Sequence, residues 1–148
     1  DPFHQDSIQC MLASCQMAGP SLVDLRTWQW LYAHPDATAS DLRDAVLGLA
    51  RELWSDHYER FFGPDPDHIL AAYQHMVAHP LYLADYVLGH VQSHQIRSRL
   101  RNRDLASETL RICSIGQVTP ELWMQKAVGG GLDAGILVED TRTALDSL

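Results

Sequence analysis

The sequence predicts an all-α fold. Apolar residues recur three and four positions apart in every long patterned stretch of the 148 residues, which is the period of an amphipathic helix. No stretch alternates apolar and polar residues over the length of a strand. Glycines, prolines and capping residues separate the stretches. We therefore expect a single helical domain over 1–148, or one lobe of a larger domain, built as an antiparallel array of about seven or eight helices.

The first two helices are expected before residue 36. The first ends at Gly19-Pro20, and the second begins at Ser21, whose hydroxyl can cap it with Asp24 three residues on. His34-Pro35 ends the second helix, because the residue before a proline avoids the α conformation. Their apolar stripes are Ile8, Met11, Leu12 and Cys15, and then Leu22, Leu25, Trp28, Leu31 and Tyr32.

The third and fourth helices are expected between residues 38 and 79. Thr38 and Ser40 compete as the cap of the third, and Gly63-Pro64 closes it. Its apolar stripe is Leu42, Val46, Leu49, Leu53 and Trp54. Asp65-Pro66 then places a capping carboxylate before a proline at the first helical position, where the missing N–H would be unbonded anyway. The fourth helix is expected to run from there to about His79.

Four more helices are expected after Pro80. The first spans about 81–102, and its strongly basic end, 97–103, is interpreted as a solvated cationic helix terminus or, alternatively, an anion site. Its buried stripe is predicted as Leu83, Val87, Leu88, Val91, Ile96 and Leu100. The remaining helices span about 105–115, 119–128 and 133–148. Gly116 and the run Gly129–Gly131 supply helix stops.

The charge and the cysteines narrow the classes of function. Eleven Lys and Arg against nineteen Asp and Glu give a net charge of −8, which leaves no broad cationic surface for nucleic acid or an anionic membrane. The three cysteines form no CxxC pair, so we expect reduced thiols rather than a disulfide framework or a cysteine zinc site. With no targeting or spanning segment visible, the chain is expected to be soluble and cytoplasmic.

The helix after Pro80 carries an unusual polar face. Residues spaced by four stack along one side of a helix, and here they are phenols and imidazoles. The residues are Tyr82, Tyr86, His90 and His94, with Ser93 and Arg97 beside them. Phenol and imidazole groups can donate hydrogen bonds to a developing oxyanion. The plainer interpretation, half-buried tyrosines and solvated histidines, stays open.

Two His-x-x-x-His pairs, His75 with His79 and His90 with His94, could each present two nitrogens to one metal. A zinc peptidase helix requires H-E-x-x-H, and Met76 and Val91 stand where its glutamate would be. We therefore expect no metal site in this chain, with a histidine metal bundle as a third and weaker hypothesis.

Four segments together resemble a known family. His79-Pro-Leu-Tyr-Leu-Ala-Asp-Tyr-Val-Leu-Gly89 resembles the substrate-side element of the oligoendopeptidase F and thimet oligopeptidase class of zinc metallopeptidases, which are zincins. Thr119–Gly129 with Gly131-Leu132 is similar to the element near their C-terminal end. Ser21–Trp28 and Asp36–Trp54 look like the helices that lie between the zinc helix and the tyrosine segment in bacterial relatives. The resemblance covers nearly the whole chain and implies the helical, C-terminal third of such an enzyme.

The resemblance implies roles for particular residues. Tyr82 and Tyr86 match the tyrosines that hydrogen bond to the oxyanion of the scissile carbonyl or to the peptide backbone. Gly89 matches the close-approach glycine, and His75 or His79 the histidine that contacts substrate. His90, on the predicted polar face, is a further candidate for substrate binding.

The sequence departs from the family in two places. Ala84 stands where many relatives have another tyrosine, and no H-E-x-x-H occurs anywhere in the chain. Zinc is therefore expected in a missing N-terminal portion of the parent enzyme, and this chain alone is expected to be inactive. The start without methionine, at the beginning of a predicted helix, fits a processed or truncated protein.

Two hypotheses follow from the sequence. In the first, the chain is one wall of an oligopeptide-hydrolysing cleft and meets its missing N-terminal portion or a second copy of itself. In the second, it is a stand-alone, non-catalytic helical module that binds a peptide or small ligand or self-associates. The first predicts a large exposed apolar surface and the second does not, so solution mass and exposed apolar area discriminate between them.

Overall fold

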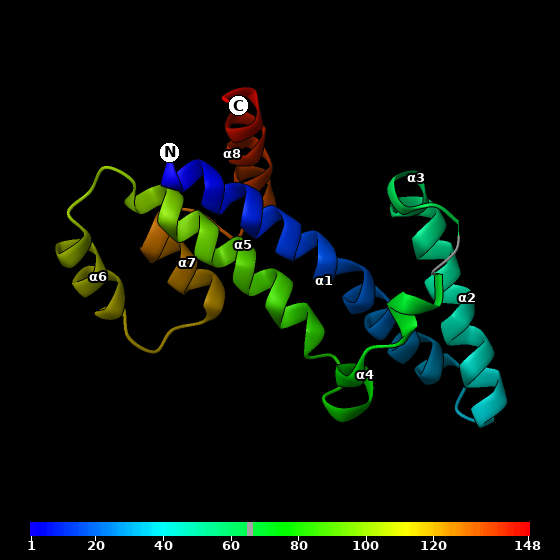
Figure 1. Ribbon diagram of the computed structural model, residues 1–148. Coiled ribbons are helices and arrows are strands. Elements are labelled where there is room, and N and C mark those ends of the chain that lie inside the picture. The colour runs from blue at the N-terminus through cyan, green and yellow to red at the C-terminus, as the bar shows by residue number, and fades with distance from the viewer. Residues whose placement is uncertain (65–66) are drawn as a thin grey trace. The chain divides into compact units, whose positions relative to one another are not determined.

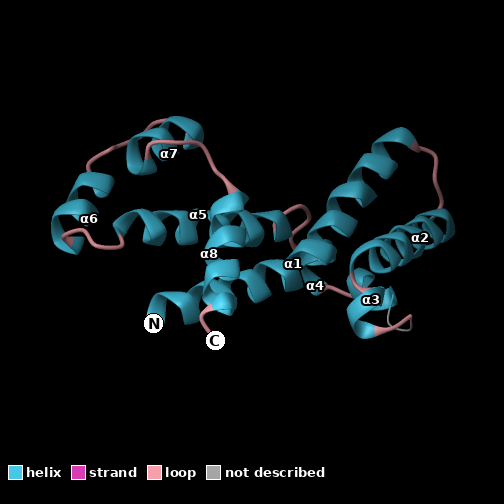
Figure 2. Ribbon diagram, turned by 90° about the horizontal axis from the view of Figure 1, so that it is seen from above, coloured by secondary structure: helices cyan, strands magenta, loops and turns pink. Residues whose placement is uncertain are grey.

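The computed structural model of the chain describes residues 1–64 and 67–148 (Figures 1 and 2). Within these ranges it has eight α-helices, one 3₁₀ helix and no strand, which confirms the predicted all-α, multi-helix fold. The elements are α1 Pro2–Ala33, α2 Ala39–His57, α3 Glu59–Phe62, η1 Asp67–Ala71, α4 Gln74–Ala78, α5 Leu83–Leu100, α6 Leu105–Cys113, α7 Pro120–Val128 and α8 Ala134–Asp146. No helix of the described part combines the length and apolar character needed to cross a bilayer.

The chain forms two compact units. Unit 1 comprises residues 1–14 and 88–148, and unit 2 comprises residues 15–87. Helices α1 and α5 therefore contribute residues to both units, whereas α2, α3, η1 and α4 belong to unit 2 and α6, α7 and α8 to unit 1.

Helix α1 runs without a break through Gly19 and Pro20, so the predicted helix end at this pair is wrong. Ser21 does not cap a new helix, because its hydroxyl donates to the carbonyl of Met17 at 2.7 Å within α1. Proline removes one backbone hydrogen bond from a helix interior. Packing outweighs that loss here, since Gly19 and Pro20 are both buried, and the predicted end near His34-Pro35 is confirmed.

Helix α2 begins where the sequence indicates. Thr38 is the N-cap, with its backbone N–H donating to Asp41 Oδ2 at 2.9 Å and its hydroxyl oxygen accepting from the Asp41 N–H at 3.3 Å. The Thr38 hydroxyl, which donates to Asp41 Oδ2 at 2.7 Å, and the Thr38 backbone N–H together hold the pKa of the Asp41 carboxyl below its ordinary value. The predicted closure at Gly63 is confirmed with an interruption at Tyr58, after which α3 ends at Gly63 with φ +80°.

The single helix predicted from Pro66 to His79 is wrong. Its proposed cap, Asp65-Pro66, lies outside the described residues, and the segment that follows consists of η1 and α4. Tyr73 has an extended backbone between them, with φ −113° and ψ 121°. Leu70 of η1 is 4% exposed in the unit 2 core, so a short 3₁₀ turn that buries this side chain replaces a continuous helix.

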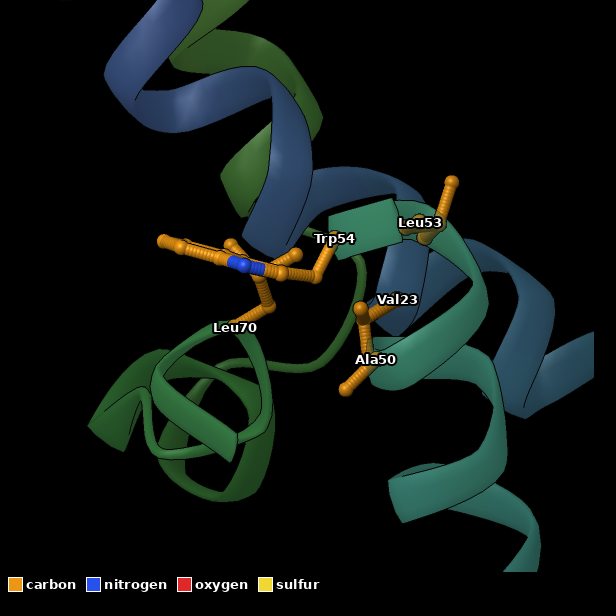
Figure 3. Close-up of a cluster of buried hydrophobic side chains, with 5 residues drawn as sticks. All are labelled: Val23, Ala50, Leu53, Trp54 and Leu70. Carbon is orange, nitrogen blue, oxygen red and sulfur yellow. The ribbon is translucent and has the colours of Figure 1, made fainter. Parts of the chain in front are cut away.

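The core of unit 2 joins α1, α2 and η1 (Figure 3). It consists of Val23 from α1, Ala50, Leu53 and Trp54 from α2, and Leu70 from η1. The indole N–H of Trp54 donates to the carbonyl of Gly63 at 2.8 Å, so this large ring is buried with its polar atom satisfied.

The first part of α1, the later part of α5, and α8 are connected in unit 1 by buried polar groups. His94 Nε2 lies 2.9 Å from Asp140 Oδ2, and the hydroxyl of Thr141 donates to the carbonyl of Ser7 at 3.2 Å. The Gln95 side chain donates to the carbonyl of Gly131 at 2.8 Å and accepts from the backbone N–H of Asp133 at 3.1 Å.

The predicted apolar stripe of α5 is correct for only part of its length. Leu83 and Val91 are buried, but Leu88 is 50% exposed, and the polar His94 and Gln95 are buried instead. Apolar character alone does not predict this burial, because the Asp140 side chain of α8 pairs with His94 and backbone groups of the loop before α8 pair with Gln95.

The last three helices begin and end close to the predicted positions. Asp104, Thr119 and Asp133 are their N-caps, and the hydrogen bonds from Ser107 hold the pKa of Asp104 below its ordinary value. Gly129 ends α7 in the left-handed conformation, at φ +85°. The guanidinium of Arg111 in α6 donates to the last carbonyls of α7, those of Lys126 at 2.8 Å and Ala127 at 2.7 Å.

The basic end of α5 is paired with acidic groups. Arg97 pairs with Asp6, and Arg101 lies 2.6 Å from Asp1 and over the ring of Phe3 at 4.4 Å. These contacts join α5 to the start of α1 within unit 1. The arginines named here are therefore already occupied by carboxylates, rather than forming an anion site.

Candidate functional site

Four of the predicted site residues meet in unit 2. We call His75, His79, Tyr82 and Tyr86 the aromatic cluster. The rings of Tyr82 and Tyr86 lie edge to face with centroids 5.3 Å apart. The His75 ring is 5.9 Å from that of Tyr86 and 6.4 Å from that of Tyr82, and is nearly parallel to the latter. The centroid of the His79 ring is 5.9 Å from that of His75 and 6.3 Å from that of Tyr82.

The turn between α4 and α5 brings these rings together. His75 lies in α4 and His79 directly after it, so one helical turn separates the imidazoles. Leu81 then adopts φ +66°, a conformation that costs a non-glycine residue about 1 kcal/mol or more. Its backbone N–H donates to Asp24 Oδ2 of α1 at 2.7 Å. The hydrogen bond to this buried carboxylate thus stabilises the turn in the chain at Leu81, and this turn places Tyr82 beside the imidazoles.

The tyrosines of the cluster are accessible at its surface. Tyr82 is 48% exposed and Tyr86 is 38% exposed, and within the described residues neither phenol oxygen has a hydrogen-bond partner. His75 is only half-buried, but its Nδ1 is buried and also lacks a partner. The cluster therefore presents two phenol groups without hydrogen-bond partners in the described part of the chain. The His75 ring packs against both of them.

The other two predicted site residues belong to unit 1. Gly89 is exposed, and no atom lies within 4 Å of where a β-carbon would stand. The chain's own packing therefore does not require glycine at this position. His90 is half-buried with its Nδ1 unpartnered, and its carbonyl accepts a hydrogen bond from Cys10 Sγ at 3.4 Å. The ring contacts that define the aromatic cluster include neither residue.

The predicted polar face of α5 does not extend to His94, which is 2% exposed. A four-residue step advances about 400° around a helix, so a stripe of such steps rotates by about 40° each time. Two steps from Tyr86 to His94 within α5 amount to about 80°, which turns the stripe from the surface towards the interior. The exposed residues of α5 are Asp85, Tyr86, Leu88, Gly89, Ser93, Arg97 and Arg99.

The histidine pairs gain no third metal ligand. Within residues 1–64 and 67–148, no group of three or more His, Cys, Asp and Glu side chains could hold a metal ion. His94 is engaged by Asp140 through its Nε2.

Two residues near the cluster were missed from the sequence. Tyr73, just before α4, has its ring 5.6 Å from that of His75. Asp24 was assigned as the capping partner of Ser21, yet it binds Leu81, which is 57 positions further along the chain. Tyr73 is only two positions before His75, so its contact is local in the sequence, whereas nothing local indicates the contact of Asp24.

The chain matches no protein-family model, no curated protein and no solved structure in the three comparisons made. The resemblance to oligoendopeptidase F and thimet oligopeptidase therefore stays a prediction.

Proposed function

We propose that the aromatic cluster binds extended oligopeptides, and that the chain supplies this wall of the cleft to a zinc metallopeptidase of the oligoendopeptidase F and thimet oligopeptidase class. One observation carries the proposal. Tyr82 and Tyr86 stand ring to ring with both hydroxyls free, and His75 contacts both rings.

The chemistry of the cluster suits a peptide backbone. A phenol donates one hydrogen bond, and the carbonyls of an extended peptide are acceptors that recur along the chain. Where a peptide carbonyl is attacked, a donor aimed at its oxygen stabilises the developing negative charge and contributes to rate. The edge-to-face contact between Tyr82 and Tyr86 limits how far either ring can turn, so the two donors are partly preorganised.

The proposal assigns the metal to another part of the parent enzyme. In that class a zinc ion supplies the activated water and the Lewis acid for hydrolysis. Because the described residues provide no zinc site, the chain on its own is expected to bind peptide without cleaving it. The reading frame upstream of Asp1 is expected to encode an H-E-x-x-H helix, and an upstream frame without one would remove the peptidase assignment.

Peptide binding is tested by titrating the ¹³C-tyrosine-labelled chain with end-blocked octapeptides of random sequence. We expect the ring signals of Tyr82 and Tyr86 to shift, and the double variant Tyr82→Phe, Tyr86→Phe to weaken binding about tenfold or more. Tyr32→Phe is the matched control, because Tyr32 is also exposed but lies outside the cluster. Equal binding by all three proteins would contradict the proposal.

A specific observation favours the alternative, a stand-alone module that binds a small ligand. Unit 2 contains a cavity with an apolar wall and a buried carboxylate, described below. Unit 2 also exposes three large apolar side chains, each at least 70% exposed: Phe61, Phe62 and Val77. A second copy of the chain or a missing partner portion could cover such side chains. Sedimentation separates these cases, since self-association gives twice the mass of a single chain.

A further inference from the structure

Unit 2 contains a partly open cavity of about 490 Å³ between α1, α2 and α4. This volume lies within the range of small-molecule sites, about 300–1,000 Å³. Apolar side chains, among them Leu31, Leu42, Val46 and Met76, form most of its wall. Asp24 and Thr27 of α1 supply the polar part.

Both polar residues have an oxygen without a partner. Asp24 is 2% exposed, and Leu81 occupies only its Oδ2, at 2.7 Å. Asp24 Oδ1 is buried and accepts no hydrogen bond, and the buried hydroxyl oxygen of Thr27 is also unpartnered. An unpaired buried carboxylate oxygen is costly, because protein groups have not replaced the water it loses.

The other buried hydroxyls of α1 show that such oxygens are normally satisfied in this helix. Ser7, Ser14 and Ser21 each donate to the carbonyl four residues earlier, at 2.7–2.8 Å. Thr27 makes no such bond, although its position in the helix interior allows one. Its free oxygen therefore differs from the local pattern and lies on the same cavity wall as Asp24.

We propose that this cavity binds a small organic amine, with its ammonium group donating to Asp24 Oδ1 and Thr27 Oγ1 and its apolar or aromatic body lying among Leu31, Leu42, Val46 and Met76. An ammonium has three donors and no acceptor, so it can satisfy both oxygens at once. The Trp28 ring, which also lines the cavity, offers a face that attracts cations.

The electrostatics of Asp24 agree with a missing counter-charge. Burial raises the pKa of its carboxyl above the ordinary value, and the hydrogen bond from the Leu81 N–H, with a smaller contribution from the nearby Trp28 side chain, only partly opposes this. None of the groups that shift this pKa is a cation. A bound ammonium would stabilise the ionised carboxylate in the position that the chain leaves uncompensated. Asp24 also positions the turn of the aromatic cluster through Leu81, but amine binding in this cavity does not require that the cluster bind peptide.

The test is calorimetric titration of the intact chain with 2-phenylethylamine and with 2-phenylethanol, its neutral counterpart. We expect the amine to bind at least tenfold more tightly than the alcohol. Asp24→Asn keeps an acceptor for the Leu81 N–H and is expected to lower amine affinity about tenfold or more while leaving alcohol binding unchanged. Asp44→Asn removes the same charge from an exposed position on α2 and should change neither.

Equal affinity for amine and alcohol, or no binding of either, would overturn the proposal. So would an Asp24→Asn protein that is folded by circular dichroism and binds the amine as well as the parent does. Should Asp24→Asn fail to fold, Thr27→Val takes its place, because it keeps the shape of the side chain and removes only the unpartnered oxygen. A severalfold loss of amine affinity in Thr27→Val is then expected, and no loss would count against the site.

Discussion

Replacing Gly19 by alanine is expected to destabilise the fold, although alanine normally stabilises a helix interior by about 1 kcal/mol over glycine. A β-carbon at Gly19 would lie 2.7 Å from the phenol oxygen of Tyr58 and 2.8 Å from Cδ2 of Leu70. The Tyr58 ring cannot easily move, because its hydroxyl donates to the Cys15 carbonyl at 2.8 Å and its ring stacks on Trp54.

The magnitude follows from these contacts. Overpacking in a core costs about 1–3 kcal/mol, and displacing the Tyr58 hydroxyl sacrifices a hydrogen bond worth about 1 kcal/mol. After the gain of about 1 kcal/mol in helix propensity, the net loss is about 1–3 kcal/mol in the free energy of unfolding. Urea unfolding followed by circular dichroism measures it through the midpoint at unchanged slope.

Gly48→Ala is the matched control. Gly48 lies inside α2, and no atom is within 4 Å of where its β-carbon would stand. Only the helix-propensity gain applies there, so we expect stabilisation by about 0.5–1 kcal/mol. If both substitutions stabilise the chain equally, Gly19 does not pack closely against Tyr58 and Leu70. Close packing at Gly19 would then no longer account for the continuity of α1 through Pro20.

Three further predictions concern single groups. Thr38→Ala should lower the free energy of unfolding by about 1 kcal/mol, because it removes the N-cap of α2. Ser40→Ala should change that free energy little. Equal effects of the two substitutions in urea unfolding would contradict the assignment of Thr38 as the cap. Arg111→Met should lower the free energy of unfolding by about 1–2 kcal/mol, because two carbonyls at the end of α7 lose their hydrogen bonds. Arg142→Met removes only an exposed ion pair and should lower it by less than about 0.5 kcal/mol in the same assay. Because burial raises the pKa of Asp24, the native state binds more protons than the unfolded state between the ordinary and the raised pKa, and stability falls as pH rises through that window. Asp24→Asn should therefore gain stability relative to the parent as pH rises from the ordinary pKa of an aspartate, about 3.9, through the raised pKa of Asp24, and a difference in urea midpoint that does not vary with pH would refute this.

The elements that were predicted correctly depend on local chemistry. Thr38, Thr119 and Gly129 cap helices through residues no more than four positions away, so their signals are contained in short stretches of sequence. The prediction at Gly19-Pro20 is wrong because the side chains that pack closely at Gly19 are Tyr58 and Leu70, about forty and fifty positions further on.

The candidate site shows the same division. His75, His79, Tyr82 and Tyr86 meet across one tight turn, so their proximity could be expected from spacing. The carboxylate of Asp24, which holds that turn and lines the cavity, comes from another helix. Its role depends on how α1 lies beside the turn, and no pattern along the chain indicates that.

The proposed peptide-binding role is tested most directly by the octapeptide titration of the tyrosine-labelled chain, with the Tyr82 and Tyr86 ring signals as the readout. Saturable shifts of these two signals, with Tyr32 unmoved and with binding weakened about tenfold in the Tyr82→Phe, Tyr86→Phe variant, are the predicted result. Ring signals that stay in place as peptide is added, or shifts at Tyr32 equal to those at Tyr82 and Tyr86, would contradict it.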